Sequence, residues 1–179
     1  MLPKNRNKHR PIHLTLDQEY FFLTARVYRG YLYFQSNKNK ELLFNTIRQG
    51  CEKFDIRLLA WAIIDNHHHL LIRIQGKNSI SGLIKFINGK SSYLLNKLEN
   101  KKGRRVWYQY FDKIIDNKKD FYRRLNYIHQ NPIKHNLVKN LKELEKYQFC
   151  SYNNYLRQFG QEWLDECFRH YPVISFVKD

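Results

Sequence analysis

The sequence is poor in the residues that build linkers and cross-linked scaffolds. Its 179 residues include only 7 Gly and 4 Pro, which argues against low-complexity linkers. The three cysteines, Cys51, Cys150 and Cys167, are odd in number, lie far apart and form no CxxC pair. We therefore expect neither a disulfide framework nor a zinc ribbon, and the pattern fits a reducing compartment such as the cytoplasm.

Long apolar runs are also missing. No stretch of about 18 apolar residues, the length that crosses a bilayer, occurs in the chain. The first ten residues are basic and polar, and no apolar stretch of the kind found in signal peptides follows them. The sequence therefore predicts a cytoplasmic protein that has no membrane partner.

Acidic residues are scarce relative to basic ones. The chain has 32 Lys plus Arg against 16 Asp plus Glu, a formal net charge of +16. Such a charge attracts polyanions, of which nucleic acid is the commonest. The 13 Tyr and 12 Phe could also stack on unpaired bases. The alternative is that the charge serves solubility alone.

The apolar pattern predicts one α+β domain. We expect strands over 20–27, 56–64, 68–74 and 106–115, and helices over 37–54, 79–98 and 118–131, the last ended by Pro132. This order is typical of a ferredoxin-like fold, with one antiparallel sheet and helices on one face. The other face is then expected to be open for a site.

Three consecutive histidines are the sharpest local feature. If a strand runs through His67, His68 and His69, the first and third share a face and the second points to the other. Two imidazoles on one face can bind one metal ion. The spacing alone does not identify the metal: imidazole suits several transition metals, and an added oxygen ligand would extend the choice to Mn²⁺ or Mg²⁺. The alternative is a surface hairpin that carries three polar side chains.

A second feature is the pair Tyr127 and Asn131. Their spacing of four places them on one face of a helix, and Asn131 precedes Pro132, so we expect its amide at a helix end. A phenol is a weak nucleophile unless a metal or a cation activates it. From these residues alone, a packing tyrosine and an Asn-Pro helix stop are the simpler interpretation.

Three segments together resemble the single-tyrosine HUH transposases, and within them the REP-associated tyrosine transposases. They are AWAIIDNHHHLLI (60–72), VWYQYFDKII (106–115) and LNYIHQNPIKHNLV (125–138), with a weaker match in YQFCSYNNY (147–155). The resemblance covers roughly residues 18 to 157 in the family's order. The fold that it implies is the same ferredoxin-like layer, with the catalytic tyrosine on an additional helix.

The resemblance also implies a chemistry. His67, His69 and Asn131 would hold a divalent ion, Mg²⁺ or Mn²⁺, and Tyr127 would attack the scissile phosphate. The activity would be cleavage and transfer of single-stranded DNA near palindromic hairpins through a 5′-phosphotyrosine. Members of the REP-associated branch are expected to act as monomers, with a homodimer as the alternative.

Basic residues outside the presumed metal site are the candidate DNA contacts. We divide the chain into a basic arm (1–17), the transposase domain (18–157) and a C-terminal tail (158–179). The expected contacts lie in the arm, in a basic loop and beside the tyrosine: Lys4, Arg6, Arg10, Lys101, Lys102, Arg104, Arg105 and Lys134.

Three positions depart from the family's pattern. His68 stands where a hydrophobic residue is usual, so its ring should find a hydrogen bond on the helix-covered side. Asp65 stands where proline is frequent. Asn136 stands where glycine is usual, and asparagine tolerates the left-handed geometry of such a turn.

Two other functions remain as alternatives. One is a nucleic-acid-binding domain of the same fold without catalysis, although intact His67, His69, Tyr127 and Asn131 argue against a decayed site. The other is a zinc-dependent phosphoesterase that uses the two histidines with acidic ligands and water. Acidic residues are sparse around both segments apart from Asp65, which argues against it.

Overall fold

The computed structural model describes residues 19–74 and 80–173. In chain order the elements are β1 (Glu19–Val27), η1 (Tyr28–Gly30), α1 (Asn37–Lys53), β2 (Ile56–Ile63), β3 (His67–Ile74), α2 (Ile80–Leu98), β4 (Trp107–Ile114), α3 (Lys118–Lys134), α4 (Leu141–Leu144), α5 (Tyr152–Phe159) and α6 (Gln161–His170). The strands form one antiparallel sheet in the order β2-β3-β1-β4. The predicted ferredoxin-like α+β fold is confirmed.

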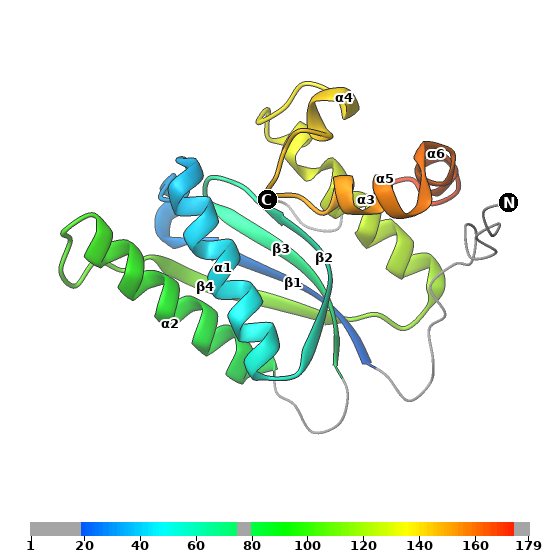
Figure 1. Ribbon diagram of the computed structural model, residues 1–179. Coiled ribbons are helices and arrows are strands. Elements are labelled where there is room, and N and C mark those ends of the chain that lie inside the picture. The colour runs from blue at the N-terminus through cyan, green and yellow to red at the C-terminus, as the bar shows by residue number, and fades with distance from the viewer. Residues whose placement is uncertain (1–18, 75–79, 174–179) are drawn as a thin grey trace, which may run out of the picture.

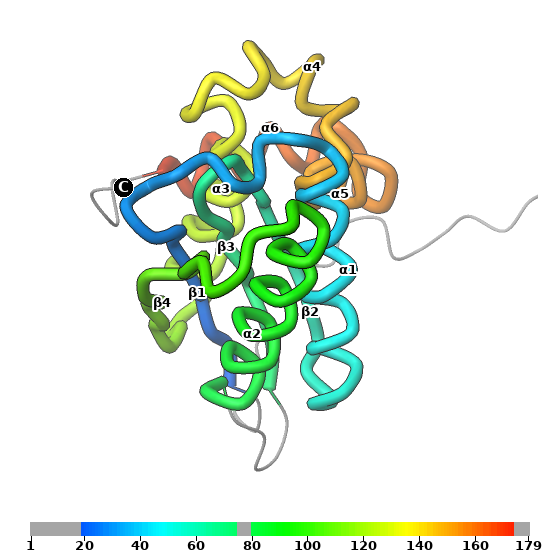
Figure 2. The backbone as a smooth tube through the Cα atoms, turned by 90° about the vertical axis from the view of Figure 1, so that its left-hand side faces the viewer, coloured from blue at the N-terminus to red at the C-terminus, as the bar shows by residue number. Residues whose placement is uncertain are grey.

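The first layer of helices covers one face of the sheet, as the sequence predicted. Figures 1 and 2 show α1 and α2 side by side against the strands. Alternate strand residues point into this layer, among them Leu23, Leu70 and Ile72, and all three are fully buried. Because side chains alternate along a strand, their neighbours in sequence face the other way.

The second face is not open, and the expectation of an empty face was wrong. Phe22, Ala60 and Leu71 line it and are fully buried under α3, α5 and α6 (Figure 1). Trp163 and Leu164 of α6 belong to the same apolar cluster. An apolar sheet face must be removed from water, and the amphipathic helices after residue 117 do this. The fold therefore has a helical layer on each side of the sheet.

Helix α3 continues through Pro132, so the expected end at Asn131 was also wrong. Proline has no N–H for the carbonyl of Ile128, four residues earlier. The thiol of Cys150 lies 3.9 Å from that oxygen and donates to it instead. The helix ends one turn later, where the N–H groups of Asn136 and Leu137 donate to the carbonyls of Ile133 and Pro132. Asn131 therefore lies inside the helix.

The turn that closes α3 gives a first testable prediction. Asn136 has φ +57°, the left-handed conformation that the family's glycine would also adopt. We expect Asn136→Ala to lower the free energy of unfolding by about 1 kcal/mol, and Asn136→Gly to leave it equal or slightly higher. Urea unfolding measures both. Asn154→Ala, at an exposed position inside α5, is the matched control, and an equal loss there would contradict the explanation.

Candidate active site

His67 and His69 lie on the second face of the sheet, and His68 points to the first, as the alternation predicted. The rings of His67 and His69 are 4.8 Å apart between centroids, and both side chains are buried. His68 is fully buried and packs edge-on against Trp107. The described residues offer neither of its ring nitrogens a hydrogen bond, so that expectation was wrong. Burial lowers the pKa of His68 to about 3, so the ring is neutral.

The inner nitrogen of each histidine on the second face is held by a neighbour. Nδ1 of His67 donates to the Asn66 side-chain oxygen at 2.8 Å, and Nδ1 of His69 lies 2.8 Å from the Thr24 hydroxyl. A ring that is held at Nδ1 presents Nε2 as its ligating atom. Both imidazoles are thus oriented in the manner of metal-binding histidines.

An ion pair holds the turn that leads into His67. The Asp65 carboxylate accepts a 2.6 Å hydrogen bond from the ammonium of Lys40, which also donates to the carbonyl of Gln35. The backbone N–H of Phe34 donates to the Asp65 carbonyl at 2.9 Å. The turn that the family often restrains with proline is here restrained by these contacts.

Helix α3 lies along the two histidines and presents a polar row to them. The ring of Tyr127 is 5.1 Å from that of His69, and the ring of His135 is 4.8 Å from that of His67. Asn131 is four residues from both Tyr127 and the C-cap residue His135, so its side chain projects from the turn between them. The structure therefore brings together Tyr127, Asn131 and both histidines, which the sequence had grouped only through the family resemblance.

The side-chain amide of Asn131 is buried without a hydrogen-bond partner among the described residues. It is 1% exposed, and among the described residues neither its amide oxygen nor its amide nitrogen has a hydrogen-bond partner. Burial of an unsatisfied amide costs about 1–3 kcal/mol. A cation bound between Asn131 and the two histidines would use the amide oxygen. Imidazoles suit several transition metals, and the amide oxygen extends the donor set towards Mn²⁺ or Mg²⁺, so these residues are compatible with the expected ion.

The described part of the chain contains no cluster of His, Cys, Asp and Glu of the kind that binds zinc. No group of three or more His, Cys, Asp or Glu is placed to hold a metal there. Burial raises the pKa of the thiols of Cys51, Cys150 and Cys167 to about 12, so all three remain protonated. These observations argue against the zinc phosphoesterase, which requires acidic ligands beside the histidines.

Tyr127 is enclosed, at 2% exposure. Its ring contacts Phe22 and His69 edge-on, and the ammonium of Lys134 lies 5.3 Å from its centroid. A DNA phosphate can reach the hydroxyl only when groups around it are displaced.

A buried arginine, which the sequence did not single out, packs against the site through Phe22. Arg124 is 2% exposed, pairs with Asp120 at 3.0 Å, and places its guanidinium 4.7 Å from the ring of Phe22. Phe22 in turn stacks on His69, with ring centroids 5.4 Å apart. The only sequence signal was the spacing of four between Asp120 and Arg124, which is common on exposed helix faces.

His135 is the second functional candidate that the sequence missed. It follows Pro132, beyond the end that the sequence predicts for the helix, so the sequence does not group it with Tyr127. Because α3 continues to Lys134, His135 stands two turns after Tyr127 and reaches His67. With Arg26, Tyr28 and Tyr108, it lines a cavity of about 510 Å³ that opens beside His67.

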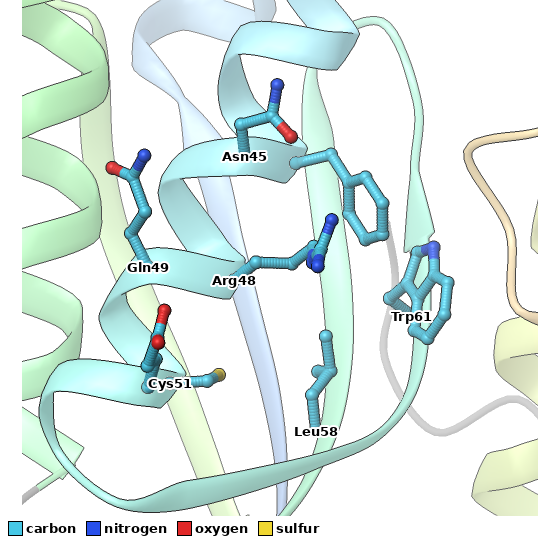
Figure 3. Close-up of a pocket in the computed structure, with 8 residues that line it drawn as sticks. Asn45, Arg48, Gln49, Cys51, Leu58 and Trp61 are labelled. Atoms are coloured by element: carbon cyan, nitrogen blue, oxygen red, sulfur yellow. The ribbon is translucent and has the colours of Figure 1, made fainter.

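Another cavity lies on the opposite face of the sheet. Its volume is about 650 Å³, between α1 and β2, with Arg48 and Trp61 in its wall (Figure 3). It contains no histidine and no residue of α3. Its position gives it no part in the site of Tyr127.

The predicted DNA contacts fall in different places. Lys4, Arg6 and Arg10 lie outside the described residues. Arg104 forms an ion pair with Glu99 at 2.6 Å and donates a hydrogen bond to the side-chain oxygen of Asn96. The other four predicted contacts are exposed: Lys101, Lys102, Arg105 and Lys134. Arg105 lies against Tyr28 and Tyr108, and Lys134 lies against Tyr127.

Within the described ranges, none of the helices is both long enough and apolar enough to cross a bilayer.

Comparisons with known proteins give a family. The family described as "Transposase IS200 like" matches residues 17–131. The chain is 17% identical to a REP-associated tyrosine transposase solved in complex with a REP hairpin, with a TM-score of 0.65 over 96% of this chain and 92% of that one. A Deinococcus radiodurans R1 protein described as a transposase has 17% identity and a TM-score of 0.45, over 75% and 96% of the two chains. No curated protein matches the sequence. Because the family match spans well over half of the chain, the protein belongs to the IS200-like transposases.

Proposed function

We propose that this transposase is a metal-dependent, single-tyrosine DNA strand transferase of the HUH type, related to the REP-associated branch. The observation that carries the proposal is that α3 places Tyr127 against His69, the neighbour of His67, and carries the buried amide of Asn131 one turn further along the same helix face. Its substrate is single-stranded DNA beside a small hairpin; a solved structure with a similar fold is bound to a REP hairpin. The net charge of +16 favours such a polyanion.

In the proposed reaction the Tyr127 oxygen attacks the scissile phosphorus. The new O–P bond replaces the bond to the 3′-oxygen, so one DNA end carries a 5′-phosphotyrosine and the other a 3′-hydroxyl. The phenol loses its proton and the departing 3′-oxygen gains one. A divalent ion held by His67, His69 and Asn131 would supply Lewis acidity at the phosphoryl oxygen.

The residues of the chain have distinct parts in this step. Thr24 and Asn66 hold the two imidazoles in the ligating orientation. The ammonium of Lys134 stabilises negative charge on the phenol oxygen and on the phosphate. Because the ester retains the energy of the phosphodiester, attack by another 3′-hydroxyl rejoins strands without a nucleotide cofactor.

The experiment that tests the proposal uses a hairpin oligonucleotide with single-stranded flanks, labelled at either end. With Mn²⁺ or Mg²⁺, the 3′-labelled strand should form an adduct with the protein that survives denaturation. The 5′-labelled strand should yield a shorter, unattached fragment. An adduct on the 5′-labelled strand, or cleavage without any adduct, would contradict the proposal.

Because Tyr127 contacts His69 of its own chain, the reactive groups are assembled within one subunit. We therefore expect no activity when Tyr127→Phe and His69→Ala proteins are unfolded, mixed and refolded together. Adduct formation on the same labelled hairpin measures this. Recovery of about a quarter to a half of wild-type activity would show instead that subunits exchange α3. Wild-type protein taken through the same refolding is the control.

A further inference from the structure

The cavity beside His67 is built from aromatic and cationic side chains. Tyr28 follows β1, Tyr108 belongs to the edge strand β4, and their ring centroids are 6.4 Å apart at 46°. The cavity measures about 510 Å³, within the usual range for small-molecule and cofactor sites. None of the described residues that line it is acidic.

The strand pairing explains why this cavity adjoins the histidines. Arg26 pairs with His67 across β1 and β3, and Val27 pairs with Trp107 across β1 and β4. The N–H of Tyr28 donates to the Val106 carbonyl at 2.8 Å. The end of β1 therefore brings the start of β4 and the start of β3 to one corner of the sheet.

An arginine fixes the aromatic wall. The guanidinium of Arg105 lies 4.7 Å from the ring of Tyr28 and 5.7 Å from that of Tyr108. It also donates to the carbonyls of Trp107 and Tyr108, at 3.1 and 3.3 Å. Arg29, with φ +54°, places its guanidinium 5.2 Å from the Tyr28 ring. Cations against the faces of these rings hold them in place while Tyr108 stays 54% exposed.

We propose that this cavity is a subsite for one unpaired nucleotide that adjoins the scissile phosphate, with the base against Tyr28 and Tyr108. The inference rests on the proposed function, because the phosphate is positioned by His67 and His69. The exposed ring of Tyr108, whose only cation contact among the described residues is Arg105, accepts any base by stacking, and Arg26 and Arg29 carry the charge that the nucleotide's phosphate requires.

The test compares hairpin substrates that carry a base or an abasic residue at the first unpaired position on each side of the cleavage site. Binding is measured by fluorescence anisotropy with metal removed, so that no strand is cut. For the wild-type protein, one of the two abasic substitutions should weaken binding by about tenfold. In Tyr108→Ala the difference between base and abasic substrates should shrink to about twofold or less.

Two further variants make the result specific. Tyr108→Phe retains the ring and should retain the discrimination. Tyr93→Ala removes a tyrosine that is 64% exposed on α2, outside the cavity, and should bind both substrates as the wild type does. The melting temperatures of the variants establish that each is folded.

The outcomes separate this proposal from the one on which it rests. Unchanged discrimination in Tyr108→Ala, or none in the wild type, would overturn the subsite. Altered sedimentation of Tyr108→Ala with unchanged discrimination would assign this surface to self-association and would also overturn it. Discrimination that depends on Tyr108 in a protein that forms no adduct would retain the cavity as a binding site for an unpaired base and refute the Tyr127 chemistry.

Discussion

Tyr127→Phe should abolish the covalent adduct with a 3′-labelled hairpin substrate while leaving DNA binding within about twofold of wild type. The substitution removes one oxygen from a ring that otherwise keeps its contacts with Phe22 and His69. Loss of a nucleophile typically lowers turnover by about 10³-fold or more. Denaturing electrophoresis measures the adduct, and anisotropy measures binding without metal.

The matched control for this change is Tyr93→Phe, which removes the same atom from an exposed tyrosine and should retain full activity. Adduct formation that persists in Tyr127→Phe would assign the nucleophile to another residue. Strand cleavage that persists without an adduct would indicate that water attacks the phosphate. Either result would end the proposed mechanism.

His69→Ala should abolish both metal binding and adduct formation. Mn²⁺ affinity is measured by isothermal titration calorimetry in the absence of DNA, so the readout does not depend on turnover. With one imidazole gone, the site keeps one histidine and an amide oxygen, too few ligands to compete with water for the ion. DNA binding without metal should remain, because it depends on the basic surface.

His69 is fully buried, so its replacement can also loosen the fold; Thr24→Val provides a second variant. Valine has nearly the shape of threonine but lacks the hydroxyl that lies 2.8 Å from Nδ1 of His69. Loss of such an outer contact typically lowers metal affinity by about 10- to 100-fold. His170→Ala, at an exposed position at the end of α6, should leave Mn²⁺ affinity unchanged. Normal affinity in both His69→Ala and Thr24→Val would refute the metal site.

Much of the site follows from local periodicity. The alternation of a strand is enough to separate His68 from its two neighbours, and helical spacing is enough to group Tyr127 with Asn131. Neither rule joins the strand to the helix. That contact depends on which residues line the second sheet face, where small Ala60 and Ala62 lie beneath the helical layer that contains α3.

The features that were missed depend on partners distant in sequence. Pro132 predicts the end of a helix from the local sequence alone. The neighbouring residues do not indicate that the thiol of Cys150 donates to the Ile128 carbonyl in place of the missing N–H. With the helix ended too early, His135 was left out of the site. The cavity beside His67 could not be predicted either, because Tyr28 and Tyr108 meet only through the pairing of β1 with β4.

The enclosure of Tyr127 bears on the fate of the covalent intermediate. A phosphotyrosine ester has two competitors for its phosphorus, water at about 55 M and a DNA hydroxyl at far lower concentration, so hydrolysis dominates unless solvent is excluded. Without DNA the residue is 2% exposed and packed against Phe22, and a strand that displaces the groups around the hydroxyl takes their place, which leaves little room for solvent. Such shielding prolongs the lifetime of the linkage until a strand end arrives, and it makes the protein a poor nuclease.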